Sequence, residues 1–570
     1  MGEMKTGGQI IWESLVHEGV EVVFGIPGGA ILPTYDDLSK YNYPIHHVLA
    51  THEQGSTHMA DGYARATGKV GVCINTSGPG ATNMITGLAT AYMDSTPIVA
   101  ISGQVSTSLL GRDGFQESDV FGISMPVTKH NYLITDIRDL PMALKEAFHI
   151  ARTGRPGPVL IDVCKDVQQD SMEFEYPAEV NLPGYHPNQN EPQLEAVERA
   201  AKLLNEAKRP LIVAGQGVSI AKAERELRHL AEVANIPVAT SLLGIGTFPA
   251  THPLSVSWGG MHGEAYTNYA MQECDVMLAI GARLDDRLTG AFETFAPKAR
   301  IIHADLDPAE MNKNLTIDTP VVGDALLTLR ELLALVQPNE HPAWIEQIED
   351  WKADSNERDI LAQETDELIA PYVMRELWHA TDEGDCTVVS DVGQHQMWEA
   401  QYFRHTKRRS LLTSGGLGTM GYALPAAIGA QLGHPDEEIW VVAGDGGFQM
   451  TMNELSTVVQ ERLPVKIAII NNGFLGMVRQ WQDVFYNKRH SGTPLFNPDF
   501  AKLAEAYGIP ARSVTSKQEV YDAIREAQAF DGPFILDFQV EETTNVYPMV
   551  APAKSNADMI RRPVSSTEGE

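Results

Sequence analysis

The chain has 570 residues and a formal net charge of −32 at pH 7. This acidity disfavours nucleic acid and anionic membranes as partners, and no run of about twenty apolar residues predicts a membrane span. One hydrophobic core does not support such a length, so we expect about three or four domains. The N-terminus lacks the apolar core of a signal peptide. The cysteines have no paired spacing for zinc or redox chemistry, which favours a cytoplasmic protein with reduced thiols at Cys73, Cys164, Cys274 and Cys386.

Strands alternate with helices in three blocks, which predicts an α/β protein with three doubly wound parallel-sheet domains. The first block closes on the apolar run Pro158–Asp162, and a Pro-rich polar stretch follows it. A charged stretch at 338–370 lacks strand-like runs and is expected to be a helical connector. The predicted domains are 1–170, 190–337 and 371–545, followed by a C-terminal tail at 546–570.

The third block carries the motif with the most chemical information. Gly444-Asp445-Gly446 follows the apolar run Ile439–Ala443, and Asn471-Asn472 follows a second run, Val465–Ile470. Neighbouring parallel strands would bring a carboxylate and an amide oxygen together, and such oxygens suit Mg²⁺. A helix that begins after Gly446-Gly447 would offer free N–H groups to a diphosphate. Either piece alone is most often a turn, but at this spacing the two resemble the thiamine diphosphate (ThDP) signature.

With these motifs, the chain resembles the acetolactate synthase (acetohydroxyacid synthase) large-subunit family of ThDP enzymes over roughly residues 6 to 550. The other segments that carry the resemblance are Phe24–Gly29, His52–Gln54, Thr76–Asn83, Gly114–Gln116, Gly154–Pro158, Arg283–Arg287, Gly415–Gly421 and Gly476–Trp481. The resemblance implies a pyrimidine-binding domain, a central FAD-binding domain and a diphosphate-binding domain in that order. It also implies ThDP, Mg²⁺ and FAD as cofactors.

The resemblance implies that Glu53 hydrogen-bonds the aminopyrimidine ring of ThDP and promotes deprotonation of its thiazolium ring. Without the resemblance, Glu53 would be an ordinary charge at a helix N-terminus. Met420 would hold the cofactor bent, and Asp445, Asn472 and the Phe474 carbonyl would bind Mg²⁺. The other implied ThDP contacts are Pro27, Gly28, Thr76, Gly80, Asn83, Gln394, His395, Gly418, Gly444, Gly446, Gly447, Gly476 and Met477.

On the substrate side, the resemblance implies that Arg287 holds the acceptor carboxylate, because a guanidinium fork binds both oxygens. Trp481 would favour 2-ketobutyrate by apolar contact. Gln116 and Lys165 complete the implied catalytic set, and Phe115 and Met261 would also line the site. The implied FAD contacts are Arg155, His262, Gly263, Gly281, Ala282, Arg283, Asp305, Asp307 and Asp324. Leu284 stands where the family usually has Phe, a mild apolar change.

The implied activity is that of a transferase. Pyruvate is decarboxylated and its two-carbon fragment joins a second 2-keto acid, the first common step of branched-chain amino acid biosynthesis. Pyruvate as acceptor gives 2-acetolactate, and 2-ketobutyrate gives 2-aceto-2-hydroxybutyrate. Because ThDP spans two domains, the family builds each site between two subunits, so we expect a homodimer or homotetramer in which Glu53 faces the partner's Asp445. A separate small regulatory subunit is also expected.

The nearest alternatives are other ThDP enzymes: pyruvate oxidase, a 2-keto-acid decarboxylase or glyoxylate carboligase. The last lacks the glutamate matched by Glu53, and the other two lack the combination of Arg287 and Trp481. A non-catalytic scaffold that binds ThDP and FAD is disfavoured because every matched catalytic position is occupied. A nicotinamide oxidoreductase would need a complete Gly-x-Gly-x-x-Gly turn, which Gly215–Ile220 does not provide.

Overall fold

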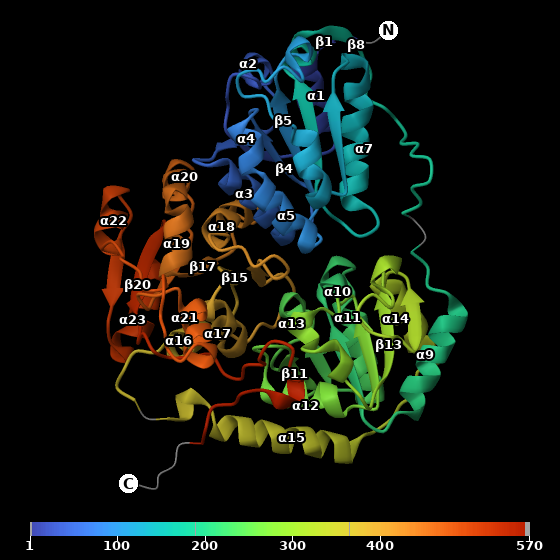
Figure 1. Cartoon of the computed structure of the whole chain (residues 1–570), viewed down its shortest axis with the longest axis vertical. Coiled ribbons are helices and arrows are strands. Elements are labelled where there is room, and N and C mark those ends of the chain that lie inside the picture. The colour runs from blue at the N-terminus through green and yellow to red at the C-terminus, as the bar shows by residue number, and fades with distance from the viewer. Residues whose placement is uncertain (1–2, 188–189, 364, 565–570) are drawn as a thin grey trace.

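The computed structural model of the protein describes residues 3–187, 190–363 and 365–564. Three lobes, each built on a six-stranded sheet, lie around the centre of the molecule (Figure 1). Every strand pair within these three sheets is parallel. The predicted α/β class with three parallel-sheet domains is therefore confirmed, while the exact domain boundaries stay a prediction.

The first lobe has the strand order β3-β2-β4-β5-β7-β6. Its central strands are buried apolar runs, as expected where helices cover both faces of a parallel sheet. The strands are β2 (Val22–Gly25), β3 (His46–Leu49), β4 (Gly71–Asn75), β5 (Ile98–Gln104), β6 (His130–Ile134) and β7 (Val159–Cys164), with a small antiparallel pair, β1 (Glu3–Thr6) and β8 (Ser171–Phe174). The helices are α1 (Gly7–His17), α2 (Leu32–Lys40), α3 (Glu53–Thr67), α4 (Pro79–Asn83), α5 (Ile85–Met93), α6 (Val120–Ser124), α7 (Leu140–Arg152) and α8 (Lys165–Gln169).

The second lobe has the order β11-β10-β9-β12-β13-β14. Alternate residues of β9 enter different cores, because Ile212 packs on one face of the sheet and Leu211 and Val213 on the other. The strands are β9 (Pro210–Ala214), β10 (Val238–Thr240), β11 (Ser255–Trp258), β12 (Val276–Ile280), β13 (Arg300–Asp305) and β14 (Thr319–Val322). The helices are α9 (Leu194–Glu206), α10 (Gln216–Ile220), α11 (Glu224–Ala234), α12 (Ala265–Glu273), α13 (Asp286–Thr289) and α14 (Ala325–Leu335).

The stretch predicted to be a helical connector contains α15 (Pro342–Glu357), which runs along the lower edge of the molecule in Figure 1. Its buried Trp344 donates a hydrogen bond from Nε1 to the Pro210 carbonyl, at 2.9 Å, and so ties the connector to the second lobe. No helix among the described residues has the length and apolar character needed to cross a bilayer.

The third lobe has the order β16-β15-β17-β18-β20-β19. Its strands are β15 (Thr387–Ser390), β16 (Leu411–Thr413), β17 (Ile439–Gly444), β18 (Lys466–Asn471), β19 (Ala511–Val514) and β20 (Phe534–Gln539). Its helices are α16 (Ala370–Ala380), α17 (Gln394–Tyr402), α18 (Ala423–Gly433), α19 (Asp445–Thr451), α20 (Leu455–Gln460), α21 (Gly476–Phe485), α22 (Phe500–Ala506) and α23 (Lys517–Ala529). The first helix after β17 begins at Asp445 itself, three residues before the position expected after Gly447. The tail then folds back on the second lobe, where Val550 N donates to the Met261 carbonyl at 2.9 Å.

The first and third lobes meet where α3 lies against α18 (Figure 1). A Cβ atom added to Gly62 would lie 2.0 Å from the Ala426 carbonyl oxygen, and one added to Gly429 would lie 1.8 Å from the Met59 carbonyl oxygen. Both distances are far below van der Waals contact. The backbones of α3 and α18 are therefore in direct contact at Gly62 and Gly429, where no larger residue would fit.

We expect Gly429→Ala to destabilise the protein by about 1–3 kcal/mol, because its methyl group would push α18 away from α3. The melting temperature measured by calorimetry should fall by at least about 2 °C. Gly29→Ala is the control, since a Cβ there meets no atom within 4 Å. An unchanged melting temperature in Gly429→Ala would mean that the two helices are not held in this contact.

Candidate active site

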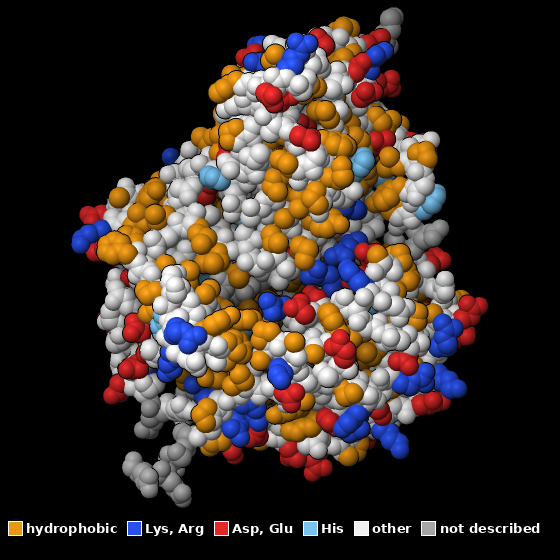
Figure 2. Space-filling view, viewed as in Figure 1, with side chains coloured by type: hydrophobic (Ala, Val, Ile, Leu, Met, Phe, Trp, Pro, Cys, Tyr) orange, Lys and Arg blue, Asp and Glu red, His pale blue; other side chains and the backbone are white. Residues whose placement is uncertain are grey.

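A cavity of about 780 Å³ lies where the three lobes meet. Figure 2 shows the surface hollowed between the lobes, with Lys and Arg side chains gathered beside the hollow. Although the chain carries a large negative charge, the lining is nearly balanced: its charged residues are Arg152, Arg155, Arg283, Arg287, Asp285, Asp305, Glu310, Asp324 and Asp445. The cavity has an end formed by the third lobe and an end formed by the second.

Asp445 is the buried carboxylate of the third-lobe end. Its Oδ2 accepts hydrogen bonds from Gly473 N, at 2.9 Å, and from Asn497 Nδ2, at 2.7 Å. Burial nevertheless raises the pKa of the Asp445 carboxyl to about 6, because no Lys or Arg among the described residues offsets the loss of water. A carboxylate in this state favours a bound cation. Asn472 follows the neighbouring strand, as predicted, and its Oδ1 accepts from Phe474 N at 3.1 Å.

The donor set at this end fits Mg²⁺ better than a transition metal. No group of three or more His, Cys, Asp or Glu side chains among the described residues forms a metal centre. One carboxylate, one amide oxygen and a backbone carbonyl are hard donors that leave positions open for phosphate oxygens. Asp445, Asn472 and Phe474 all line the cavity, so the residues present suit the predicted metal.

The start of α19 and the neighbouring His395 suit a diphosphate. Residues 444–447 line the cavity at the first turn of the helix, where backbone N–H groups lack helical partners. His395 is buried beside Gly444, and burial lowers its pKa to about 3, so the ring is neutral. Its Nε2 has no hydrogen-bond partner among the described residues. A buried polar atom without a partner is rare, and a ligand that reaches this part of the cavity would supply one.

A loop at 414–420 joins the two ends of the cavity and carries Met420. Buried Asp391 holds the end of this loop, because its carboxylate accepts from Gly421 N at 3.0 Å and Ala423 N at 3.1 Å. Gly418 adopts a φ of 73°, in the left-handed region that favours glycine. Met420 therefore stands on a backbone that is fixed from the third lobe.

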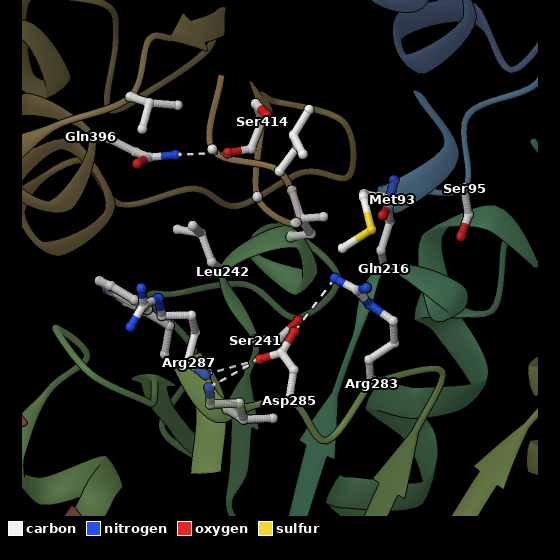
Figure 3. Close-up of a pocket in the computed structure, with 18 of the residues that line it drawn as sticks. Met93, Ser95, Gln216, Ser241, Leu242, Arg283, Asp285, Arg287, Gln396 and Ser414 are labelled. Atoms are coloured by element: carbon white, nitrogen blue, oxygen red, sulfur yellow. Dashed lines mark hydrogen bonds and ion pairs between the residues drawn. The ribbon is translucent and has the colours of Figure 1, made fainter. Parts of the chain in front are cut away.

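The second-lobe end is built on Asp285 (Figure 3). Its carboxylate accepts from the backbone N–H groups of Arg287 and Leu288, both at 3.2 Å, and pairs with Arg283 Nη2 at 3.4 Å. These contacts fix the segment that carries both arginines. The Arg287 guanidinium lies against the Met261 sulfur, with Nη1 at 3.5 Å. Its weak ion pair with Asp286, at 3.7 Å, leaves donors free for another anion.

Most of the residues predicted in the second and third lobes come together in this cavity. The predicted ThDP contacts that line it are Gln394, His395, Gly418, Met420, Gly444, Asp445, Gly446, Gly447, Asn472, Phe474, Gly476 and Met477. The predicted FAD contacts that line it are Arg155, His262, Gly281, Ala282, Arg283, Asp305 and Asp324, and the substrate residues are Met261, Arg287 and Trp481. Gly263 and Asp307 lie outside the lining. Asp307 instead accepts from Arg155 Nη1 at 3.3 Å, one layer behind the wall.

The predicted ThDP and catalytic residues of the first lobe form a separate group, whereas the predicted FAD contact Arg155 of this lobe lines the cavity. Glu53 is half-buried at the start of α3 and accepts from Asn83 Nδ2 at 2.9 Å. A Cβ on Gly80 would lie 3.4 Å from Glu53 Oε1 and 2.9 Å from Thr76, and Thr76 also packs on Gly28. None of the predicted first-lobe ThDP or catalytic residues lines the cavity: Pro27, Gly28, Glu53, Thr76, Gly80, Asn83, Phe115, Gln116 and Lys165.

Three of these residues, Phe115, Gln116 and Lys165, differ in their exposure and backbone conformation. Phe115 is 89% exposed and Gln116 has a φ of 61°, so the loop holds an apolar ring in water and a strained backbone. Lys165 is the half-buried first residue of α8. Within one chain, therefore, the cavity that contains Asp445 does not include Glu53 or the other predicted first-lobe ThDP residues.

The sequence interpretation missed several residues of this region. Asn497 binds both Asp445 and Asn471, the latter through Oδ1 at 2.8 Å, but it lies in a loop with no motif. Gln216, Gly217, Ser241 and Leu242 line the second-lobe end. The only signal for them was the Gly-Gln-Gly turn after β9, which alone is weak.

The comparisons with known proteins show which family the chain is similar to. Three thiamine pyrophosphate enzyme domains match along the chain: the N-terminal TPP binding domain at 5–123, the central domain at 197–332 and the C-terminal TPP binding domain at 391–538. The chain is 48% identical over 568 residues to the acetolactate synthase large subunit of Corynebacterium glutamicum, covering 98% of this chain and 90% of that protein. It is 48% identical over 565 residues to the acetolactate synthase of Mycobacterium bovis, covering 97% and 91%. The large subunit of Porphyra purpurea is 45% identical over 574 residues, covering 98% and 96%.

We expect Asn497→Ala to weaken Mg²⁺ binding by about tenfold, because partners that orient a metal ligand typically contribute 10–100-fold to affinity. Mn²⁺ can replace Mg²⁺ in a titration followed by electron paramagnetic resonance, with ThDP present. Asn339→Ala, in the connector, provides the matched control. Equal affinities in the two variants would contradict a role for Asn497 in orienting Asp445.

Proposed function

The chain belongs to the acetolactate synthase large-subunit family of thiamine pyrophosphate enzymes, and from that membership we propose how its site works. The protein is a transferase that decarboxylates pyruvate and joins the remaining two-carbon fragment to a second 2-keto acid. One observation carries the proposal for the site. A single cavity contains the Asp445–Asn472 group, suited to a metal diphosphate, together with Arg287, suited to a carboxylate.

ThDP, when bound, supplies a carbon nucleophile that adds to the keto group of pyruvate and takes up the electron pair released as CO₂ leaves. We propose that Asp445, Asn472 and the Phe474 carbonyl hold Mg²⁺, which binds the diphosphate. The first turn of α19 contributes N–H donors to the same phosphates. Met420 supports the cofactor between its two ends. The role of Glu53 is to hold a proton at the pyrimidine ring, and its hydrogen bond from Asn83 fixes the carboxylate for this purpose.

The acceptor keto acid is proposed to bind between Arg287 and Trp481. Met261 connects the two, because its sulfur contacts Arg287 and its side chain belongs to the apolar cluster against which Trp481 packs. A guanidinium beside an apolar surface suits a small carboxylic acid with a short alkyl group. Pyruvate and 2-ketobutyrate have this chemistry, and the Trp481 ring offers contact to the extra methylene of 2-ketobutyrate.

FAD is proposed to occupy the second-lobe end. Arg155 and Arg283 supply cations for its diphosphate. Gly217 and Gly281 also line the cavity, and their backbones pack so closely that neither position has space for a side chain. A Cβ on Gly217 would lie 2.6 Å from Gly281 Cα. The separation of the two predicted half-sites supports a homodimer or homotetramer in which Glu53 faces the partner's Asp445. Exposed apolar side chains on the first and third lobes suit such an interface: Leu49, Phe115, Met125, Met450 and Phe496.

A separate small regulatory subunit remains part of the proposal, since several relatives are named as large subunits. A cytoplasmic location is proposed as well. The four cysteines are free and buried, which suits a reducing compartment.

A product assay tests the proposed function. The purified chain with pyruvate, Mg²⁺, ThDP and FAD should form 2-acetolactate, measured after acid conversion to acetoin. Glu53→Gln should still bind ThDP but lose at least about 99% of turnover, because a positioned proton-transfer group contributes 10²–10⁴-fold. Exposed Glu195→Gln is the matched control. Acetaldehyde as the main product would indicate a decarboxylase instead, and peroxide would indicate an oxidase.

Co-expression of two inactive variants tests the shared site. In a dimer of Glu53→Gln and Asp445→Asn chains, one site carries both substitutions and the other carries neither. Half of randomly assembled dimers are such hybrids, so we expect about a quarter of wild-type activity from the mixture. If both residues served the same site within one chain, the mixture would stay inactive.

A further inference from the structure

A buried cluster of charges lies between α3, α5 and the third lobe, outside the residues assigned above. Arg65 pairs with Asp61 through Nε and with Asp94 through Nη2, the latter at 2.9 Å. Its Nη1 donates to the Thr413 carbonyl at 2.9 Å, and Tyr422 donates to Asp61 Oδ1 at 2.7 Å. The three charged side chains are between 0% and 8% exposed. Two carboxylates thus share one guanidinium at the contact between two lobes.

The two carboxylates differ in what else they bind. Asp61 is satisfied by Arg65 and Tyr422, within the packed helices. Asp94, immediately after α5, accepts from two consecutive backbone N–H groups: Gly415 N to Oδ2 at 3.0 Å and Gly416 N to Oδ1 at 2.7 Å. Charge-assisted bonds of this kind are about twice as strong as neutral ones. Asp94, a residue of the first lobe, therefore holds the third-lobe loop at 414–420 through these two hydrogen bonds.

At Gly416, this third-lobe loop lies close to both the first and the second lobe. A Cβ there would lie 2.7 Å from Asp94 Oδ1 and 2.9 Å from Arg283 Nη2. The loop is also tied by Thr90 Oγ1 and Thr419 Oγ1, 2.7 Å apart, and by Thr419 N, which donates to Ser414 Oγ at 3.0 Å. Its residues Gly415, Gly416, Leu417, Gly418 and Met420 line the cavity. Residues on both sides of Asp94, Met93 and Ser95, line the second-lobe end (Figure 3).

We propose that Asp94 is a positioning residue for both cofactors. It fixes the position of the loop at 414–420. The loop in turn positions Met420 in the third-lobe end of the cavity and the Gly416 backbone beside Arg283 in the second-lobe end. This inference rests on the proposed function. Buried ion clusters often contribute little net stability compared with apolar packing. Positioning of the loop explains this ion cluster better than stability does. The Asp94 carboxylate accepts from two backbone N–H groups of a glycine-rich loop that has no helical hydrogen bonds to hold it.

The matched pair Asp94→Asn and Asp61→Asn tests the proposal in the full-length protein. Each removes one negative charge from Arg65, but only Asp94 binds the loop. For Asp94→Asn we expect the dissociation constants of ThDP and of FAD to rise by about tenfold or more, as when a partner that orients a ligand-binding group is lost. Asp61→Asn should change both by less than about twofold while lowering the melting temperature to a similar extent.

Hydrogen–deuterium exchange in the cofactor-free protein gives a readout that does not depend on activity. The peptide covering residues 413–421 should exchange faster in Asp94→Asn than in Asp61→Asn. Equal exchange and equal cofactor affinities in the two variants would overturn the proposal. If wild-type protein binds neither cofactor, the proposed function fails instead, and the exchange comparison still decides whether Asp94 holds the loop.

Gly416→Ala keeps the test decisive if Asp94→Asn does not fold. The added methyl group would lie 2.7 Å from Asp94 Oδ1, so the loop must shift, while every side chain of the charge cluster keeps its chemical identity. We expect the same loss of affinity for both cofactors. Wild-type affinities in a folded Gly416→Ala protein would show that the position of this loop does not matter for binding, and so would refute the proposal.

Discussion

The cavity depends on a constraint of parallel sheets, namely that all strands of a sheet end at the same edge. In the third lobe, β17 and β18 deliver Asp445 and Asn472 to such an edge. In the second lobe, β12 and β13 deliver Gly281 and Asp305. Side chains at these edges have no further sheet to bury them, so they are available to a ligand. Two edges that face each other make one site with two kinds of binding surface.

Desolvation sets the electrostatic character of that site. Burial raises the pKa of Asp445 and of Asp391 to about 6 and lowers that of His395 to about 3. The three side chains differ in how many hydrogen-bond partners they have. Asp391 is satisfied by backbone N–H groups and serves the loop that carries Met420. Asp445 is only partly satisfied, and His395 keeps a nitrogen without a partner among the described residues. Asp445 and His395, whose loss of water is not fully offset by hydrogen bonds, are the groups proposed to lie beside the metal ion and the diphosphate.

Sequence reasoning succeeded where a residue's place follows from local structure. Asp445 and Asn472 were predictable because apolar runs mark the strands and both residues come directly after them. Asn497 was not predictable, because its contact with Asp445 spans 52 positions and comes from a loop without periodicity. Asp94 was missed for a similar reason: nothing near it in the chain indicates that it faces Gly415. The family resemblance already implied that Glu53 faces the partner's Asp445, and within one chain Glu53 does not line the cavity that contains Asp445.

The contact between α3 and α18 also has a consequence for how the chain folds during synthesis. Arg65 meets the Thr413 carbonyl across 348 positions, and Asp61 meets Tyr422 across 361. When the first two lobes have left the ribosome, the glycine face of α3 still has no helix to cover it, and Arg65 lacks its last acceptor. Contacts so distant in sequence form late and leave apolar surface exposed meanwhile. The lobe that is synthesised first is thus completed only after α18 has been made.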